Sequence, residues 1–109
     1  MDVIPERLIC FNVTKSIRDW NRGSIYECVR KYWRMSKQKA EMADYCLGVS
    51  HGKVIAVYKP MIWQTVEEGE YKGRLMFEGE EVADSPLLGE DFSLEFDHVQ
   101  NPVRYVGNW

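Results

Sequence analysis

Residues 45–58, with the sequence YCLGVSHGKVIAVY, decide the fold class. Two apolar, β-branched runs, YCLGVS and KVIAVY, flank His51 and Gly52, and a two-residue connection of this kind is typical of a β-hairpin. Each run is apolar at successive positions, so both faces of each strand need to be covered. The stretch therefore predicts a hairpin in the middle of a sheet or in a small closed barrel.

Other β-prone stretches lie on both sides of this hairpin. Pro60 has no backbone N–H to donate, so the second hairpin strand is expected to end or bulge near it, before Trp63. The acidic residues 67–73 predict an exposed loop. Further strands are predicted for residues 7–14 (RLICFNVT), 74–77 (RLMF), 92–96 (FSLEF) and 103–106 (VRYV).

One principal helix is predicted to begin at Ser24. Ser24 and Glu27 have the spacing of a capping box, in which the Ser side chain accepts from the first turn and the Glu reaches back. The helix is expected to end at Trp33 and Arg34. Its apolar stripe is predicted to consist of Ile25, Cys28, Val29 and Tyr32.

The remaining segments complete a prediction of fold class. Ser36 provides an N-cap for a second, short helical segment through Ala43, and residues 15–23 predict a loop. A chain of 109 residues has room for one hydrophobic core, so residues 1–109 are expected to form a single domain. The expected fold is α+β, a small, partly open β-barrel of five or six short strands capped by one helix.

Composition limits the class of protein. Hydrophobic residues make up 45% of the chain, too many for a disordered segment. No apolar stretch approaches the roughly 18 residues that span a bilayer, and no signal peptide is visible, so we expect a cytoplasmic protein without membrane contact. Cys10, Cys28 and Cys46 form no metal-binding or redox motif, which predicts buried free thiols in a reducing compartment.

Charge is divided unevenly along the chain. Residues 1–63 contain 11 Lys and Arg against 6 Asp and Glu, whereas residues 64–109 contain 3 against 11. This division predicts one basic and one acidic face, although an unevenly decorated solvated surface is the simpler interpretation. The net charge of −3 argues against a strong non-specific binder of nucleic acid.

Catalytic and metal-binding patterns are not found in the sequence. His51 and His98 are the only side chains with an ordinary pKa near neutrality, and neither has a nucleophile beside it in sequence. Glu78, Glu80 and Glu81 form the densest carboxylate cluster, but their spacing matches no metal or phosphate loop, and a solvated charge run explains them. We therefore predict no catalytic residue, metal or cofactor; the sequence favours a non-catalytic protein but leaves open whether the chain is an enzyme.

Several aromatic and arginine side chains instead predict a binding site. Aromatic rings stack on nucleobases, and guanidinium groups form paired hydrogen bonds with phosphate or with a base edge. The alternative is that the rings belong to the core and the arginines pair with nearby carboxylates. The predicted ligand-binding residues are Trp33, Arg34, Tyr58, Trp63, Arg74 and Arg104.

The arrangement of these residues resembles that of two groups of proteins. A set of small bacterial and phage proteins shares the patterns found here at residues 30–34 (RKYWR), 45–63, 73–79 (GRLMFEG) and 101–106 (NPVRYV), without implying a function. The hairpin and the later strands also resemble the barrels of the PUA-like group, which includes EVE, ASCH and YTH domains. That resemblance implies a barrel that binds RNA or a modified base in an aromatic-lined pocket.

Three classes of function remain open from the sequence. The first is a non-catalytic module that binds a nucleotide, a modified base or a short nucleic-acid feature. The second is a protein-interaction factor, such as a phage-type inhibitor or adaptor, that uses the acidic C-terminal half. The third is a nuclease or phosphoesterase, which ranks last because no base or metal set is evident.

Overall fold

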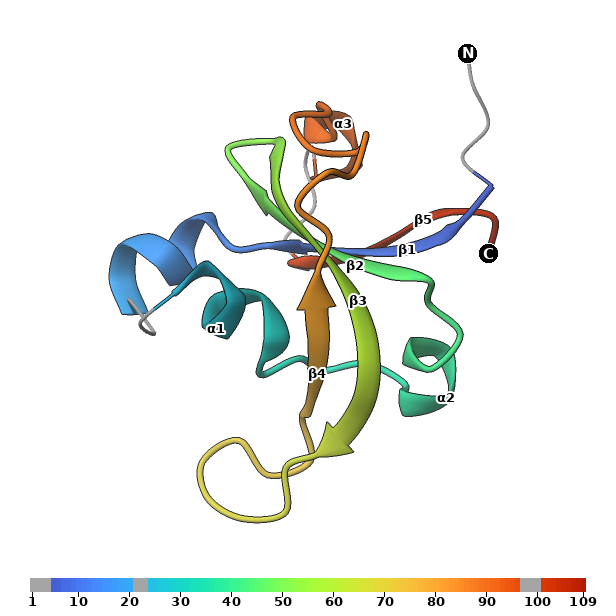
Figure 1. Cartoon of the computed structure of the whole chain (residues 1–109). Helices are drawn as coiled ribbons and strands as arrows, with labels where there is room; N and C mark the ends of the chain where they lie inside the picture. Colours follow the sequence, from blue (N-terminus) through green and yellow to red (C-terminus); the bar gives the residue numbers. More distant parts are fainter. Residues whose placement is uncertain (1–4, 21–23, 97–100) are drawn as a thin grey trace.

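A computed structural model describes residues 5–20, 24–96 and 101–109, which form a five-stranded mixed sheet with short helices (Figure 1). The strand order is β4-β3-β2-β1-β5, with β1 and β2 parallel and the other neighbours antiparallel. In chain order the elements are β1 (Arg7–Asn12), η1 (Ser16–Trp20), α1 (Ile25–Arg30), α2 (Lys37–Ala40), β2 (Tyr45–Ser50), β3 (Lys53–Thr65), β4 (Leu75–Glu81), α3 (Ser93–Phe96) and β5 (Val103–Gly107).

The predicted central hairpin is confirmed. β2 and β3 are joined by His51 and Gly52, whose φ angles of 51° and 81° are the left-handed values that a tight hairpin turn requires. β2 lies in the middle of the sheet and is buried on both faces, as its continuous apolar run predicts. Local turn chemistry and apolar patterning together fix this part of the fold.

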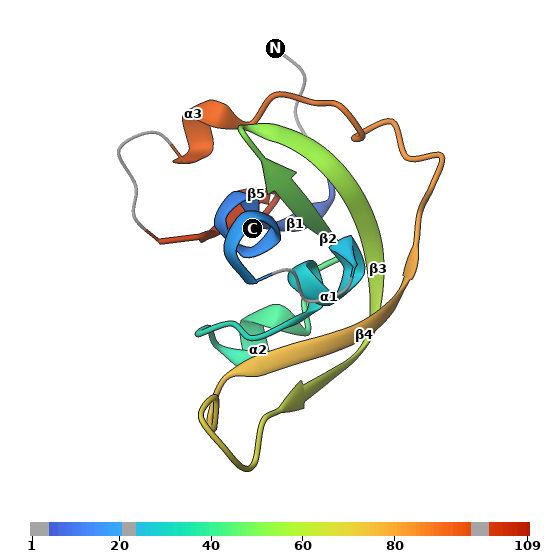
Figure 2. The same cartoon turned by 90° about the vertical axis from the view of Figure 1, so that its left-hand side faces the viewer.

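The sheet is covered on both faces. The parallel pairing of β1 and β2 requires a crossover, and residues 13–44 supply it with η1, α1 and α2. Figure 2 shows α1 and α2 lying inside the curve of β3 and β4. This side of the core includes Phe11, Cys28, Val29, Trp33, Ala40, Trp63 and Phe77. The other face is covered by the segment between β4 and β5 through Val82, Leu87, Phe92 and Phe96.

Both predicted N-cap contacts are present, but the described contacts of the Glu27 carboxylate are with Arg30 and Lys31 and do not complete a capping box, and α1 is shorter than predicted. The Ser24 side chain accepts from Glu27 N–H at 3.1 Å, and the Ser36 side chain accepts from Lys39 N–H at 3.3 Å. α1 ends at Arg30 because Lys31 has extended backbone angles, φ −157° and ψ 158°. The predicted stripe is therefore only half right: Cys28 and Val29 are buried, whereas Ile25 is 42% exposed and Tyr32 lies outside the helix.

Beyond α1 the chain forms an isolated antiparallel bridge. Trp33 and Leu75 exchange two backbone hydrogen bonds of 2.9 and 2.8 Å. The bridge holds Trp33 against Leu75, the first residue of β4, in a backbone pairing that a residue of a continued helix could not make. A tertiary contact thus decides where the helix ends.

The outer edge of β4 is covered by side chains of α1 as well as by this bridge. Arg30 Nε donates to the carbonyl oxygen of Phe77 at 2.9 Å, and the Tyr26 hydroxyl accepts from Gly79 N–H at 3.0 Å. Backbone groups of an edge strand would otherwise be open to pairing with another chain. The α+β class and the five strands are confirmed, but the sheet is not closed into the predicted barrel, because β4 and β5 lie at opposite edges.

Two other predictions were wrong. Residues 92–96 contain the helical turn α3 in place of a strand: Asp91 Oδ1 accepts from Ser93 N–H at 2.9 Å and from the Ser93 hydroxyl at 2.6 Å, which starts the turn. Phe92 and Phe96 are four residues apart and pack on the same core cluster, so their spacing suits a helical turn equally well. Within residues 15–23, predicted to be a loop, the structure has the π-helix η1.

The region around Pro60 bulges as predicted. The pairing register between β3 and β4 shifts between Pro60 and Ile62, and β3 continues beyond the bulge to Thr65. Residues 67–73 form the exposed connection to β4, except that Tyr71 is half-buried. Within the described ranges, no helix combines the length and apolar character needed to cross a membrane.

The three cysteines are buried free thiols, as predicted. Burial, followed by the negative charge of Glu95, raises the pKa of Cys10 from its ordinary value of 9.0 to about 12. Burial also raises the pKa of Cys46. The folded protein therefore holds these protons more tightly than the unfolded chain does.

We expect stability to fall at alkaline pH. A raised thiol pKa contributes stability that is complete below pH 9.0, where unfolded thiols remain protonated, and that is lost as the pH rises towards about 12. Urea unfolding at about pH 8 and about pH 10.5 measures the loss. Cys10→Val removes one of the two thiols whose pKa is raised, so it should reduce the loss of unfolding free energy between the two pH values. Equal stability at both values would contradict the prediction.

Candidate functional site

Three of the six predicted ligand-binding residues meet at one hollow. Trp33, Arg34 and Arg74 line a cavity of about 330 Å³, a volume at the lower end of the range for small-molecule sites. The other lining residues are Lys31, Tyr32, Asn101, Pro102 and Val103. Segments that lie far apart in the sequence therefore form a single site.

The fold brings these segments together through backbone hydrogen bonds. The bridge between Trp33 and Leu75 places residues 31–34 beside Arg74. On the opposite wall, Asn12 N–H donates to the carbonyl oxygen of Pro102 at 2.8 Å. The Asn101 side-chain oxygen accepts from the backbone N–H two residues later at 2.9 Å, which fixes the turn before β5 and leaves the amide NH₂ as a donor.

The lining of the hollow is cationic. Lys31, Arg34 and Arg74 contribute positive charges, and no lining residue among those described is acidic. Lys31 Nζ lies 3.4 Å from a Glu27 carboxylate oxygen, so its charge is partly balanced. Within the described chain, Arg34 and Arg74 have no carboxylate within 4.0 Å. Two guanidinium groups are thus available to an anion that enters the hollow.

Tyrosine rings flank these charges. Tyr32 and Tyr71 stack with ring centroids 4.4 Å apart and planes 11° from parallel. The Arg74 guanidinium lies 5.2 Å from the centre of the Tyr71 ring, and Lys31 Nζ lies 5.4 Å from that of Tyr32. The hollow therefore combines cations with aromatic and apolar surface.

Trp33 belongs mainly to the core. Its side chain is 7% exposed and stacks on Phe11, with ring centroids 4.4 Å apart. Its indole N–H donates to the carbonyl oxygen of Val29 at 2.7 Å. The indole contributes part of the wall of the hollow, and one of its faces is occupied by Phe11.

Tyr58 and Trp63 are in the core and do not line this hollow. They are 4% and 9% exposed, and both rings pack against Phe77. Burial, followed by the negative charge of Glu81, raises the pKa of Tyr58 to about 12, so its hydroxyl is neutral at physiological pH. Both residues therefore belong to the core, as the alternative interpretation of the sequence predicts.

Arg104 lies on the opposite face of the sheet. It pairs with Cys10 across β5 and β1, and directly opposed residues share a face. Cys10 belongs to the cluster on the far side from Trp33, while Val103 belongs to the cluster on the near side. Arg104 Nε is buried without a hydrogen-bond partner among the described residues.

The sequence analysis missed Lys31, Tyr32 and Asn101. Lys31 and Tyr32 directly precede Trp33 and Arg34, so an extended conformation for this segment would have identified them. Asn101 is identifiable from sequence only as a turn residue before Pro102. Its place on the wall depends on the pairing of β1 with β5.

The groups considered for catalysis are dispersed. His51 is exposed at the hairpin turn, and His98 lies outside the described residues. Glu78, Glu80 and Glu81 are exposed on β4. In the part of the chain that is described, no group of three or more His, Cys, Asp or Glu side chains is arranged to hold a metal ion.

Comparisons of the chain with models of known families, with curated proteins and with solved structures gave no match.

Proposed function

We propose that this chain is a non-catalytic module that binds a nucleotide, a modified base or a short segment of nucleic acid in the hollow lined by Trp33, Arg34 and Arg74. The observation that carries the proposal is the convergence of Arg34 and Arg74, without carboxylate partners in the described chain, on a hollow with aromatic and apolar walls. A nucleotide combines an anion with a flat apolar ring and matches both features.

Each part of the ligand has a complementary group. Arg34 and Arg74 can each form paired, charge-assisted hydrogen bonds with phosphate oxygens. The apolar surface of Pro102 and Val103 suits a planar base, and the Asn101 amide can donate to the base edge.

We expect Arg34→Gln and Arg74→Gln each to weaken ligand binding about tenfold, because each removes a charge-assisted contact. Thermal-shift screening against nucleoside monophosphates and short oligonucleotides, with and without modified bases, identifies the ligand, since a ligand of the native state raises the melting temperature. Titration calorimetry then measures affinity. For an oligonucleotide, losing one phosphate contact should also reduce the slope of log K against log salt by about 0.7.

Lys59→Gln is the matched control. Lys59 is exposed on β3 and does not line the hollow, so its loss makes the same change of net charge without touching the site. Lys59→Gln should bind the ligand with the same affinity as the wild type. The proposal fails if no compound in the panel raises the melting temperature, or if all three variants lose affinity equally.

A further inference from the structure

A second surface, at the bulge of β3, exposes two consecutive apolar side chains. Met61 is 59% exposed and Ile62 is 51% exposed. Residues of a regular strand alternate between faces, but here the pairing shifts from Pro60 opposite Gly79 to Ile62 opposite Glu78, leaving Met61 without a partner on β4. The extra residue places both apolar side chains in solvent. We refer to Met61 and Ile62 as the ridge.

Hollows lie on both sides of the ridge. The larger, of about 480 Å³, lies between the ridge and α1 and is lined by Tyr26, Glu27, Arg30, Glu78, Gly79 and Glu80. The smaller, of about 290 Å³, extends towards α2 and is lined by Glu41, Ala43, Pro60 and Trp63. Met61 and Ile62 contribute to both. An exposed apolar ridge with a hollow on either side and a polar rim is typical of a protein-binding surface.

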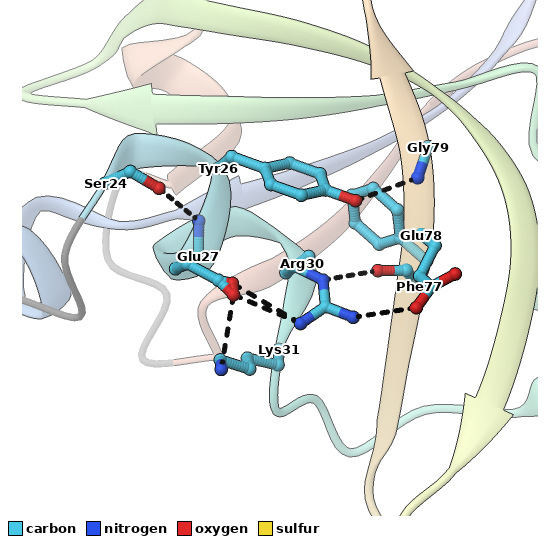
Figure 3. A network of polar contacts seen from close by, with 8 residues as sticks. All are labelled: Ser24, Tyr26, Glu27, Arg30, Lys31, Phe77, Glu78 and Gly79. Carbon is cyan, nitrogen blue, oxygen red and sulfur yellow. Dashed lines mark hydrogen bonds and ion pairs between the residues drawn. The ribbon is translucent and has the colours of Figure 1, made fainter.

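The larger hollow is held in shape by the contacts between α1 and β4 shown in Figure 3. The Tyr26 hydroxyl accepts from Gly79 N–H, and Arg30 donates to the Phe77 carbonyl oxygen. Because these contacts fix the wall before any partner arrives, binding would require little ordering of the surface.

The rim carries an excess of negative charge. Arg30 is the only cation that lines either hollow in the described chain, and it lies 3.2 Å from Glu27 and 3.8 Å from Glu78. Glu27 also contacts Lys31. Glu41 and Glu80 form no ion pair within 4.0 Å with any described residue. Lys59 is opposite Glu80 in the sheet but lines neither hollow, so one carboxylate beside each hollow is open to a partner.

We propose that the ridge docks a basic segment of a partner protein, in which large apolar side chains are flanked by Lys or Arg. The apolar side chains would occupy the hollows beside Met61 and Ile62, and the basic groups would face Glu41 and Glu80. Charge complementarity selects this occupant, since an acidic segment would be repelled by the same carboxylates. The surface shares no residue with the nucleotide site, so the two proposals stand or fall separately.

Selection from a random heptapeptide library against the purified chain tests the proposal. The selected peptides should combine Leu, Met, Phe or Trp with neighbouring Lys or Arg. The best peptide should bind Met61→Ser/Ile62→Ser at least about tenfold more weakly, because the apolar contact at the centre is lost. Glu41→Gln and Glu80→Gln should each weaken it about threefold and make the affinity less sensitive to salt.

Matched controls lie elsewhere on the surface. Leu94, 86% exposed on α3, and Glu90, exposed before it, line neither hollow, so Leu94→Ser and Glu90→Gln should leave affinity unchanged. All the variants alter exposed side chains and should keep the wild-type melting temperature. The proposal is overturned if no peptide is selected, if the selected peptides are acidic or uncharged, or if the double variant binds them as tightly as the wild type.

Discussion

Trp33→Ala is expected to lower the free energy of unfolding by about 3–5 kcal/mol, the usual cost of deleting a large aromatic side chain from a core. The indole is 7% exposed, stacks on Phe11 and donates to the Val29 carbonyl oxygen, so the substitution leaves a cavity and an unpaired acceptor. A small domain is typically stable by about 5–15 kcal/mol, so this loss is a large share of the total.

Comparing the urea unfolding of Trp33→Ala with that of Arg34→Ala distinguishes a residue of the core from a residue that only lines the binding site. Arg34 is the next residue and is exposed, so its replacement should change stability by less than about 0.5 kcal/mol while weakening ligand binding. Trp33→Phe keeps an aromatic ring but loses the indole hydrogen bond, so its free energy of unfolding should lie between those of Trp33→Ala and Arg34→Ala. A Trp33→Ala variant within about 1 kcal/mol of the wild type would contradict the assignment of Trp33 to the core.

Gly79→Ala is expected to cost about 1–3 kcal/mol, because it inserts a methyl group where two strands already touch. A Cβ atom at position 79 would lie 3.0 Å from the carbonyl carbon of Lys59 and 3.1 Å from Pro60 Cα, and closer still to the Lys59 carbonyl oxygen. All three are backbone atoms, so the clash cannot be relieved by turning a side chain. The two strands must separate at the bulge, which also strains the hydrogen bond to Tyr26.

Glu80→Ala, one residue further along β4, is the control for this substitution. Its side chain is exposed, so stability should change by less than about 0.5 kcal/mol. Urea unfolding compares the two variants, and the amide resonances of Met61 and Ile62 report whether the bulge has rearranged. A Gly79→Ala variant as stable as the wild type, with unchanged resonances, would show that the close approach of the strands is not required.

Features determined by neighbouring residues could be predicted from the sequence. The turn at His51 and Gly52 and the caps at Ser24 and Ser36 depend on contacts within a few positions, and all are present. The end of α1 could not be predicted, because it depends on Trp33 meeting Leu75 more than forty positions later. The open sheet could not be predicted either, because it depends on the order in which distant strands pair. Short apolar patterns such as residues 92–96 suit a strand or a helical turn, and a contact with Gly52 joins α3 to the hairpin.

The site could be predicted only in part, for a related reason. Arg34 and Arg74 are distant in sequence, and the bridge beside them brings both to the hollow. Tyr58 and Trp63 are aromatic, which is why the sequence placed them in the binding site, but their positions on β3 direct their rings towards Phe77. Arg104 adjoins Val103 in sequence, yet the alternation of side chains along β5 puts it on the other face.

α1 covers the outer edge of β4 and so keeps this strand from pairing with a strand of another copy. A helix of six residues does not persist alone in water, so α1 depends on the strand whose edge it shields. If the segment from Tyr26 to Trp33 detaches, the backbone groups of Leu75, Phe77 and Gly79 are uncovered in one step. That transient form would present an unpaired strand edge, to which a strand of another chain can add.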